Sequence, residues 1–203
     1  MVARTLFTSV ASGDMKNLQR REELRALASL SDIAFMNQSH SNTVAQVSDA
    51  SRVVDADALV TTSKGLGIAV ITADCLPILL SSPQVVAAVH AGRVGVGNGI
   101  LDRTVELMQS LGARDITAIV GPSICADCYE VSPQMYQEFI VENPEAATST
   151  EKHALDLKRS ARAQLEKLGV ATRDLGICTL ENHDYFSFRR DHTPERVAGV
   201  IAL

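Results

Sequence analysis

The sequence predicts an α/β fold in which stacked β-sheets are layered with flanking helices. Two patterns along the chain support this class. Short apolar runs rich in β-branched residues have the length and composition of strands, and amphipathic segments with helical spacing lie between them. The strand-like runs are almost continuously apolar, which is typical of strands buried on both faces. A layered arrangement buries both kinds of element, although the pattern leaves the strand order open.

Each predicted element follows from its local pattern. The predicted strands span residues 33–36, 58–61, 67–73, 76–80, 85–90, 116–121, 175–179 and 197–202. The predicted helices span residues 16–30, 99–111, 132–141 and 157–168. Ser132 and Pro133 mark the start of the third helix, because serine is a preferred N-cap residue and proline fits the first turn. Gly112 and Gly169 follow the second and fourth helices, and glycine commonly ends a helix.

Composition limits the classes of protein that fit this chain. With 203 residues, 46% apolar and 21% charged, the chain can fill one core, so we expect a single domain over residues 1–203. The net charge is −5 and no long run of Lys or Arg is present, which argues against nucleic-acid and membrane-surface binding. No apolar run reaches the length of a membrane span, and the first 15 residues lack the apolar region of a signal peptide. We therefore expect a cytoplasmic protein.

The four cysteines are expected to be thiols, because a reducing cytoplasm disfavours disulfides. Cys125 and Cys128 have the spacing of a redox motif or of half a zinc site. The sequence contains no second pair with this spacing to complete four ligands. The pattern therefore favours two ordinary loop or core cysteines over a metal site.

Three polar segments carry the residues with the strongest chemical potential. Residues 37–44, 72–77 and 89–97 each adjoin an apolar, strand-like run, and they contain His40, Cys75 and His90 respectively. Two imidazoles and a thiolate suit Zn²⁺, and three protein ligands leave a fourth position open for water or substrate. The simpler alternatives are hydrogen-bonded histidines and a small core cysteine. The glycine-rich turn after His90 matches neither a P-loop nor a dinucleotide-binding fingerprint.

Several motifs in this order resemble those of one family. They are Asn37-Gln38-Ser39-His40, Ala56 to Thr61, Thr72 to Leu79, Val89-His90-Ala91-Gly92, Gly121 to Ile124, Cys128 to Val131, Cys178-Thr179 and Phe186 to Asp191. Together they cover nearly the whole chain. The sequence resembles the laccase-domain (YfiH-like) family, described as purine nucleoside phosphorylases and formerly as multicopper polyphenol oxidases.

The resemblance implies a fold, a metal site and a reaction. The fold is expected to be similar to the catalytic domain of cytotoxic necrotising factor, with stacked sheets flanked by helices. The metal ligands are expected at His40, Cys75 and His90, with zinc as the usual ion and copper as the older assignment. The implied reaction is phosphorolysis of adenosine or inosine to a free base and ribose 1-phosphate. Adenosine deamination and methylthioadenosine cleavage are the related activities.

We expect further residues to act around these ligands. Asp74 is predicted to orient a ligand or to act as a base beside Cys75 and His90. Arg189 and Arg190 are predicted to recognise anions, since guanidinium groups match phosphate oxygens, with Arg190 serving the catalytic step. The predicted substrate-binding residues are Asn37, Gln38, Asn42, Arg93 and Arg189. The expected partners are a purine nucleoside and phosphate, with the chain as a monomer or homodimer.

The sequence departs from the family pattern at three places. Family members usually continue His-Ala-Gly with Trp-Arg, where this chain has Arg93 and Val94. The usual Thr-Gly-Arg near the C-terminus is replaced by the segment Thr193 to Arg196, and the N-terminal part is shorter than is usual. These departures put substrate preference or rate in question.

Three other functions remain open. A Cys75–His90 pair also suits a thiol hydrolase such as an amidase, because a neighbouring imidazole activates a thiolate. A copper-dependent polyphenol oxidase needs several copper sites, and five histidines supply few ligands for them. The third alternative is a catalytically weakened binding protein, for which the missing Trp-Arg is the indication.

Overall fold

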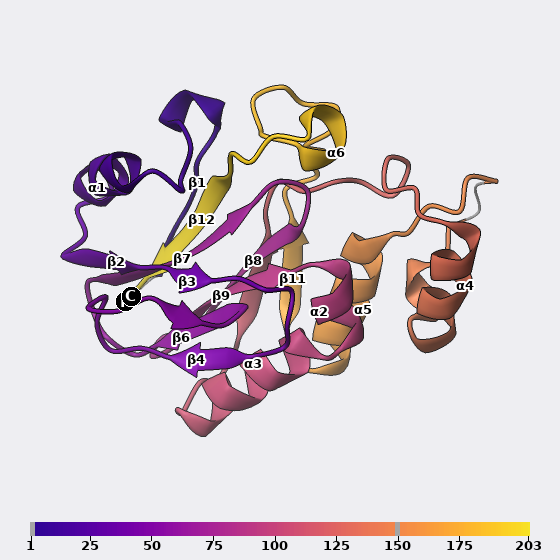
Figure 1. Ribbon diagram of the computed structural model, residues 1–203. Coiled ribbons are helices and arrows are strands. Elements are labelled where there is room, and N and C mark those ends of the chain that lie inside the picture. Colours follow the sequence, from indigo (N-terminus) through magenta and orange to yellow (C-terminus); the bar gives the residue numbers. More distant parts are fainter. Residues whose placement is uncertain (1–2, 149–150) are drawn as a thin grey trace.

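Two β-sheets lie face to face at the centre of the molecule, and helices cover their outer faces (Figure 1). The computed structural model describes residues 3–148 and 151–203. The four-stranded sheet has the order β1 (Arg4–Phe7), β12 (Val197–Ala202), β7 (Leu66–Thr72) and β2 (Asp32–Ala34). The six-stranded sheet has the order β11 (Ala171–Asp174), β10 (Thr117–Val120), β8 (Leu76–Ser81), β9 (Val86–Ala91), β6 (Ala58–Thr61) and β4 (Val44–Gln46). A small pair joins β3 (Met36–Asn37) and β5 (Val54–Asp55).

Helices complete the outer layers. The helices are α1 (Leu18–Leu27), α2 (Arg93–Gly97), α3 (Ile100–Ser110), α4 (Pro133–Glu142), α5 (Leu157–Lys167) and α6 (Phe188–Asp191), with 3₁₀ turns at Val10–Ser12 and Pro144–Ala146. Helix α1 packs on the four-stranded sheet, whereas α3, α4 and α5 share a hydrophobic cluster with the outer face of the six-stranded sheet. The layers are therefore helix, sheet, sheet and helix.

The strands of the larger sheet are apolar on both faces because both faces are covered. In β8, Ile78 and Leu80 pack toward the helices, and Leu79 between them packs against the four-stranded sheet. Strand β9 alternates in the same way, and all its residues are buried. Alternate side chains of a strand point to opposite faces, so a strand in the middle of four layers has an almost continuous apolar sequence.

Most predicted elements are confirmed by the structure. The predicted mixed α/β class is confirmed, and Ser132 caps α4 by accepting a hydrogen bond from the backbone N–H of Met135. The predicted strand at 175–179 is wrong, because the strand is β11 at Ala171–Asp174 and residues 175–179 form a loop. Strand β11 is a polar edge strand, so its sequence lacks the apolar run on which the prediction depended. The elements β1, β4, β5, α2 and α6 were not predicted either, because each is only two to five residues long and too short to show a clear pattern.

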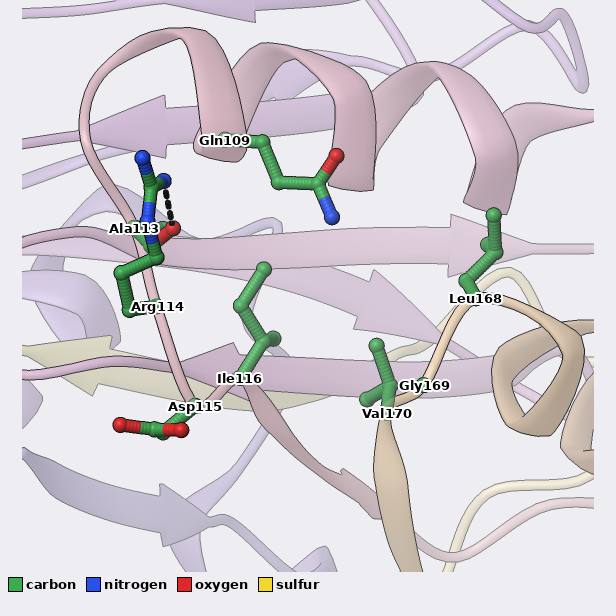
Figure 2. Close-up of a pocket in the computed structure, with 8 residues that line it drawn as sticks. All are labelled: Gln109, Ala113, Arg114, Asp115, Ile116, Leu168, Gly169 and Val170. Atoms are coloured by element: carbon green, nitrogen blue, oxygen red, sulfur yellow. Dashed lines mark hydrogen bonds between the residues drawn. The ribbon is translucent and has the colours of Figure 1, made fainter.

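A surface cavity of about 530 Å³ lies where the loops leading into β10 and β11 meet the end of α3 (Figure 2). Its lining residues belong to 109–116 and 168–170. Thr117 begins β10 and pairs with Ser81 at the end of β8, so this cavity is at the opposite end of the sheet from Cys75. Within the described residues, no helix is long and apolar enough to cross a membrane.

Candidate metal and active site

Four strand ends meet at one end of the six-stranded sheet. Cys75 directly precedes β8, and the antiparallel register pairs Leu76 with Ala91 in β9. This register brings Cys75 beside the end of β9, where His90 and Gly92 lie. The adjacency follows from the hairpin, because each residue at the start of β8 must face one at the end of β9.

The other side of β9 brings in two further segments. Strand β6 runs antiparallel to β9, with Ala58 opposite Val89, so Asp57 lies next to His90. The backbone N–H of His90 donates to the carbonyl of Asp57 at 2.7 Å. Strand β4 runs parallel to β6 from Val44, which places the preceding loop with His40 at the same sheet end.

The structure brings His40, Cys75 and His90 together. Their potential ligand atoms all lie within 4.8 Å of one another. The Sγ atom of Cys75 is 3.7 Å from Nε2 of His40, and the two imidazole rings meet edge to face with centroids 4.6 Å apart. His90 is buried, Cys75 is half-buried and His40 is exposed, so the group opens to solvent on the His40 side.

Asp57 is the central polar residue behind these side chains, and it was not among the predicted site residues. Its fully buried carboxylate contacts Nδ1 of His90 at 2.7 Å. It also accepts hydrogen bonds from the backbone N–H groups of Ser39, His40 and Ser41 and from the Ser41 hydroxyl. His40 has a φ of 62°, an unusual conformation for a non-glycine residue that these bonds hold in place. One carboxylate therefore positions both imidazoles.

The electrostatics of the group follow from these contacts. Burial opposes ionisation of Asp57, but hydrogen bonds from His90 and Ser41 hold its pKa well below the usual range. Burial likewise opposes protonation of His90, but Asp57 and Cys75 raise its pKa to about 9. Burial alone would raise the pKa of Cys75, whereas hydrogen bonds from His40 and His90 lower it to about 6. In the metal-free protein Cys75 is therefore a thiolate at neutral pH.

The structure explains why a glycine, Gly92, follows His90 and Ala91. A Cβ atom at this position would lie 2.8 Å from Cδ2 of His40 and 3.2 Å from Sγ of Cys75. A side chain here would push these two groups apart. The absence of a side chain allows strand β9 to approach the His40 loop closely.

A cavity of about 460 Å³ adjoins the three side chains. It is lined by Lys16, Arg21, Met36, Asn37, Gln38, His40, Ile71, Thr72, Ala73, Cys75, His90 and Arg196. Three of these are cationic, which makes the cavity suited to an anion. The hydroxyl of Thr72 is buried and has no hydrogen-bond partner among the described residues. A buried polar group of this kind normally finds a partner.

The carboxylate of Asp74 accepts hydrogen bonds from the neighbouring loops. Its Oδ1 accepts a hydrogen bond from the Thr179 hydroxyl, and its Oδ2 accepts one from the backbone N–H of Arg189, each at 2.7 Å. Asp74 also adopts a φ of 84°. In the structure the carboxylate that contacts a predicted ligand is that of Asp57, and Asp74 fixes the loop that presents Cys75.

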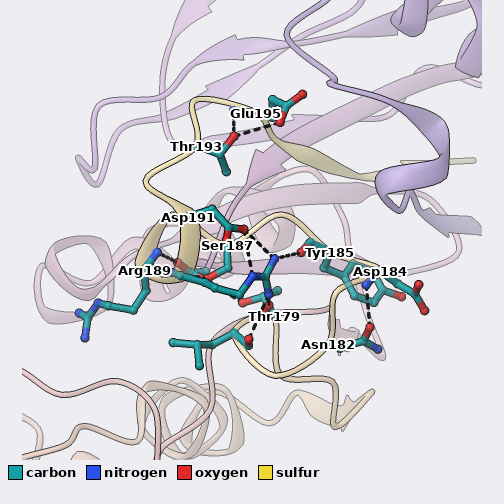
Figure 3. A network of polar contacts seen from close by, with 12 residues as sticks. Thr179, Asn182, Asp184, Tyr185, Ser187, Arg189, Asp191, Thr193 and Glu195 are labelled. Carbon is teal, nitrogen blue, oxygen red and sulfur yellow. Dashed lines mark hydrogen bonds and ion pairs between the residues drawn. The ribbon is translucent and has the colours of Figure 1, made fainter.

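The side chain of Arg190 forms hydrogen bonds within its own loop. Figure 3 shows the polar network of this loop, including its partners Thr179, Tyr185 and Asp191. Nη1 of Arg190 donates to the carbonyls of Thr179 and Leu180, and its Nη2 donates to the carbonyl of Tyr185. The Nε atom bonds Asp191. These contacts engage each nitrogen of the guanidinium and hold residues 179–191 together.

Arg93 and Arg189 lie close to Tyr129, which sequence reasoning had not selected. The guanidinium of Arg189 is 5.3 Å from the Tyr129 ring and donates to the carbonyl of Glu130. Burial and the nearby charge of Cys75 raise the pKa of Tyr129, and Arg93 and Arg189 oppose this shift. Tyr129, Arg93 and Arg189 therefore form a polar border beside Cys75.

The three predicted amide residues have different surroundings. Gln38 lines the cavity, but its amide bonds both the N–H and the carbonyl of Ile71. Asn37 lines the cavity too, and its amide donates to Asp55 at 3.0 Å. Asn42 donates to the carbonyl of Asn98 and is not among the lining residues.

The donor set fits a divalent metal ion. Asp57 engages Nδ1 of His90 and leaves Nε2 as the free ligand nitrogen, an arrangement common for metal-binding histidines. The lowered pKa of Cys75 supplies the thiolate that metal binding requires. Two nitrogens and one sulfur suit zinc or copper, and a three-ligand set leaves one position free.

Comparisons with known proteins give a consistent family relationship. A family model described as multi-copper polyphenol oxidoreductase laccase matches residues 6–203. A purine nucleoside phosphorylase of Streptomyces griseus is 43% identical over 183 residues, which are 84% of this chain and 74% of that protein.

Solved structures agree with this relationship. The crystal structure of Neisseria meningitidis protein NMB0706 aligns with a TM-score of 0.86 and 30% identity, covering 99% of this chain and 94% of that one. The Bacillus licheniformis protein YfiH has the same fold, with a TM-score of 0.85 and 23% identity over 99% of this chain and 92% of its own.

Proposed function

Because the chain belongs to the multi-copper polyphenol oxidoreductase laccase family, several members of which are named purine nucleoside phosphorylases, we propose that it is a zinc-dependent purine nucleoside phosphorylase. The substrates would be adenosine or inosine and inorganic phosphate. The single observation that supports this most strongly is the group of His40, Cys75 and His90 at the wall of a cation-lined cavity. Adenosine deamination and methylthioadenosine cleavage are extensions of the same proposal.

The proposed metal is held by His40, Cys75 and His90. When bound, zinc would supply a Lewis acid with an open position beside the cavity. Asp57 would keep His90 in the tautomer that directs Nε2 toward the ion and would fix the backbone of His40. Copper remains the alternative, because the same donor set accepts it.

The cavity cations are proposed to bind phosphate. Arg21 and Arg196 donate to nearby backbone carbonyls, which fixes their side chains, while Lys16 is exposed at the cavity wall. Positive groups at this position would hold the phosphate nucleophile and stabilise the charge that develops during transfer of the sugar. We assign anion recognition to these three residues in place of Arg190, because Nε, Nη1 and Nη2 of Arg190 are all engaged within its own loop. The hydrogen bonds of Arg21 and Arg196 to carbonyls each use a single nitrogen.

The nucleoside is proposed to lie across Cys75 toward Tyr129. Tyr129, Arg93 and Arg189 are placed to contact the base, because aromatic and guanidinium groups stack on planar rings. Arg93 stands where the family usually has tryptophan, so it would replace one stacking surface with another.

Incubation of the zinc-loaded protein with adenosine or inosine tests the proposed reaction. We expect free base and ribose 1-phosphate when phosphate is present, and no base release when it is omitted. Deaminated product without phosphate would support the deaminase extension. Failure to release base from either nucleoside with a full complement of metal would contradict the proposal.

Replacing Lys16 with alanine is expected to raise the KM for phosphate about tenfold, because an interaction with a charged group contributes about 1.5–3 kcal/mol and this side chain is exposed. The KM for the nucleoside should change little. Steady-state kinetics with each substrate varied in turn measures both values. Lys64→Ala removes an exposed lysine outside the cavity and should leave both constants unchanged. Equal effects of the two variants would contradict the phosphate assignment.

A Cys75 thiol hydrolase is the second candidate, supported by the low pKa of Cys75 and its contacts with two imidazoles. The expected likeness to the catalytic domain of cytotoxic necrotising factor belongs with this candidate. An amide-hydrolysing activity that persists after metal removal and is lost in Cys75→Ala would favour this candidate over phosphorolysis.

The low pKa of Cys75 also predicts how the metal-free protein reacts with iodoacetamide. Labelling of Cys75 should rise with pH through a midpoint of about 6, because the thiolate is the reactive form. In His40→Ala the midpoint should shift upward, since a hydrogen bond from His40 lowers this pKa. Mass spectrometry of the Cys75 peptide measures the labelled fraction. A wild-type midpoint near the ordinary value of 9 would contradict the prediction.

A further inference from the structure

A second group of metal-ligand side chains lies outside the proposed active site. Cys125, Cys128, Cys178 and Glu181 present ligand atoms that all lie within 4.8 Å of one another. The Sγ atom of Cys128 is 3.6 Å from a carboxylate oxygen of Glu181. All the cysteines are free thiols, so no disulfide accounts for their proximity.

Two loops that are far apart in the sequence form this group. The loop after β10 carries Cys125 and Cys128, and the loop after β11 carries Cys178 and Glu181. Backbone hydrogen bonds from Ser123 to Ile177 and from Thr179 to Ser123, each 3.2 Å long, join the two loops. The sulfurs therefore meet because a backbone bridge sets the loops in register.

The surroundings of Cys178 suit a metal-bound thiolate. The backbone N–H groups of Cys125, Glu181 and Leu180 are directed at the sulfur of Cys178. Backbone N–H groups directed at sulfur are a common feature of metal centres held by cysteine, because they stabilise the thiolate charge.

The close spacing of the sulfurs also suits a cation. Cys128 contacts the sulfur of Cys125, and thiolates at such short separation repel one another. A divalent ion removes this repulsion and binds the sulfurs together. Zn–S bonds of about 2.3 Å place the sulfurs of a tetrahedral site about 3.8 Å apart, a separation that the observed limit of 4.8 Å permits.

We propose that Cys125, Cys128, Cys178 and Glu181 form a second, structural zinc site. Three thiolates and one carboxylate fill four positions, so this site would be closed, in contrast to the three-ligand group at Cys75. The ion would fasten the two loops to each other. These loops carry Tyr129 and Thr179, and the hydroxyl of Thr179 bonds the carboxylate of Asp74 beside Cys75. The site therefore supports the loop that presents Cys75 without contacting substrate.

Metal content of the full-length protein, purified reduced and dialysed after zinc loading, tests this proposal. We expect two zinc ions per wild-type chain and one in Cys75→Ser, which removes a ligand of the first group only. Cys178→Ser should also retain one ion, and the double variant should retain none. Equal zinc content in the wild type and Cys178→Ser would overturn the proposal. So would the absence of zinc from a folded Cys75→Ser protein.

Cobalt substitution identifies the ligands independently of activity. In Cys75→Ser, bound Co²⁺ should give the intense sulfur-to-cobalt absorption of a site with several thiolates, and Cys128→Ser should weaken it. Glu181 is exposed, so Glu181→Ala should fold normally yet bind this ion at least about tenfold more weakly. Unchanged affinity in Glu181→Ala would remove Glu181 from the ligand set and overturn the four-ligand site. Sulfur-to-cobalt absorption absent from Cys75→Ser would overturn the site altogether.

Discussion

Cys75→Ser is expected to lose the metal ion of the proposed active site and to lower kcat/KM for phosphorolysis by about a thousandfold. A serine hydroxyl stays protonated near neutral pH, whereas the pKa of Cys75 is about 6. The variant therefore loses an anionic ligand that His40 and His90 both contact. A Lewis acid contributes several kcal/mol to a transition state, and about 4 kcal/mol corresponds to this loss of rate. Metal analysis and steady-state kinetics on the same preparation measure the two effects together.

Histidine variants provide the matched comparison for this result. His40→Ala should lose the same ion, because Nε2 of His40 lies 3.7 Å from the Cys75 sulfur. His183→Ala removes an exposed imidazole that lies outside both groups of potential ligands, so it should retain metal and activity. Wild-type rates in a Cys75→Ser protein that has lost the ion would rule out a catalytic metal at this position.

The residues that ligand chemistry selected come together in the structure, but the residue that positions them did not stand out in the sequence. His40, Cys75 and His90 were recognisable because two imidazoles and a thiolate are ligand types that suit zinc, and because the family motifs include the same three residues. Asp57 resembles an ordinary turn residue before a strand. Its role depends on the register between β6 and β9, which is a contact between distant segments and leaves no local pattern.

The cationic side chains also could not be assigned from the sequence alone. Arg190 has the right chemical type for phosphate, yet its partners are carbonyls of its own loop. Lys16 and Arg196 belong to opposite ends of the chain and line one cavity because Asp14 bonds the backbone N–H of Arg196. A side chain's type is visible in the sequence, whereas the partner it finds depends on the tertiary structure.

Asp57→Asn is expected to lower the free energy of unfolding of the metal-free protein by about 3–5 kcal/mol and metal affinity by about 10–100-fold. Both carboxylate oxygens of Asp57 accept hydrogen bonds, from His90 and His40 on one side and from Ser39 and Ser41 on the other. An amide replaces one acceptor with a donor, so N–H groups would face N–H groups in a buried site. Urea denaturation and zinc titration measure the two losses.

The stability difference between wild type and Asp57→Asn should depend on pH in a definite direction. His90 has a raised pKa of about 9, so its pairing with Asp57 contributes fully below the unfolded value of about 6.5 and is lost as pH rises through 9. The pKa of Asp57 is lowered, so its contribution is lost only in strong acid. The difference should therefore be largest near pH 6 and decline toward pH 9. Asp55→Asn, at an exposed neighbouring aspartate, should change the free energy of unfolding by less than about 0.5 kcal/mol at either pH. A difference for Asp57→Asn that grows toward pH 9 would contradict the charged pair, because loss of the imidazolium proton must weaken it.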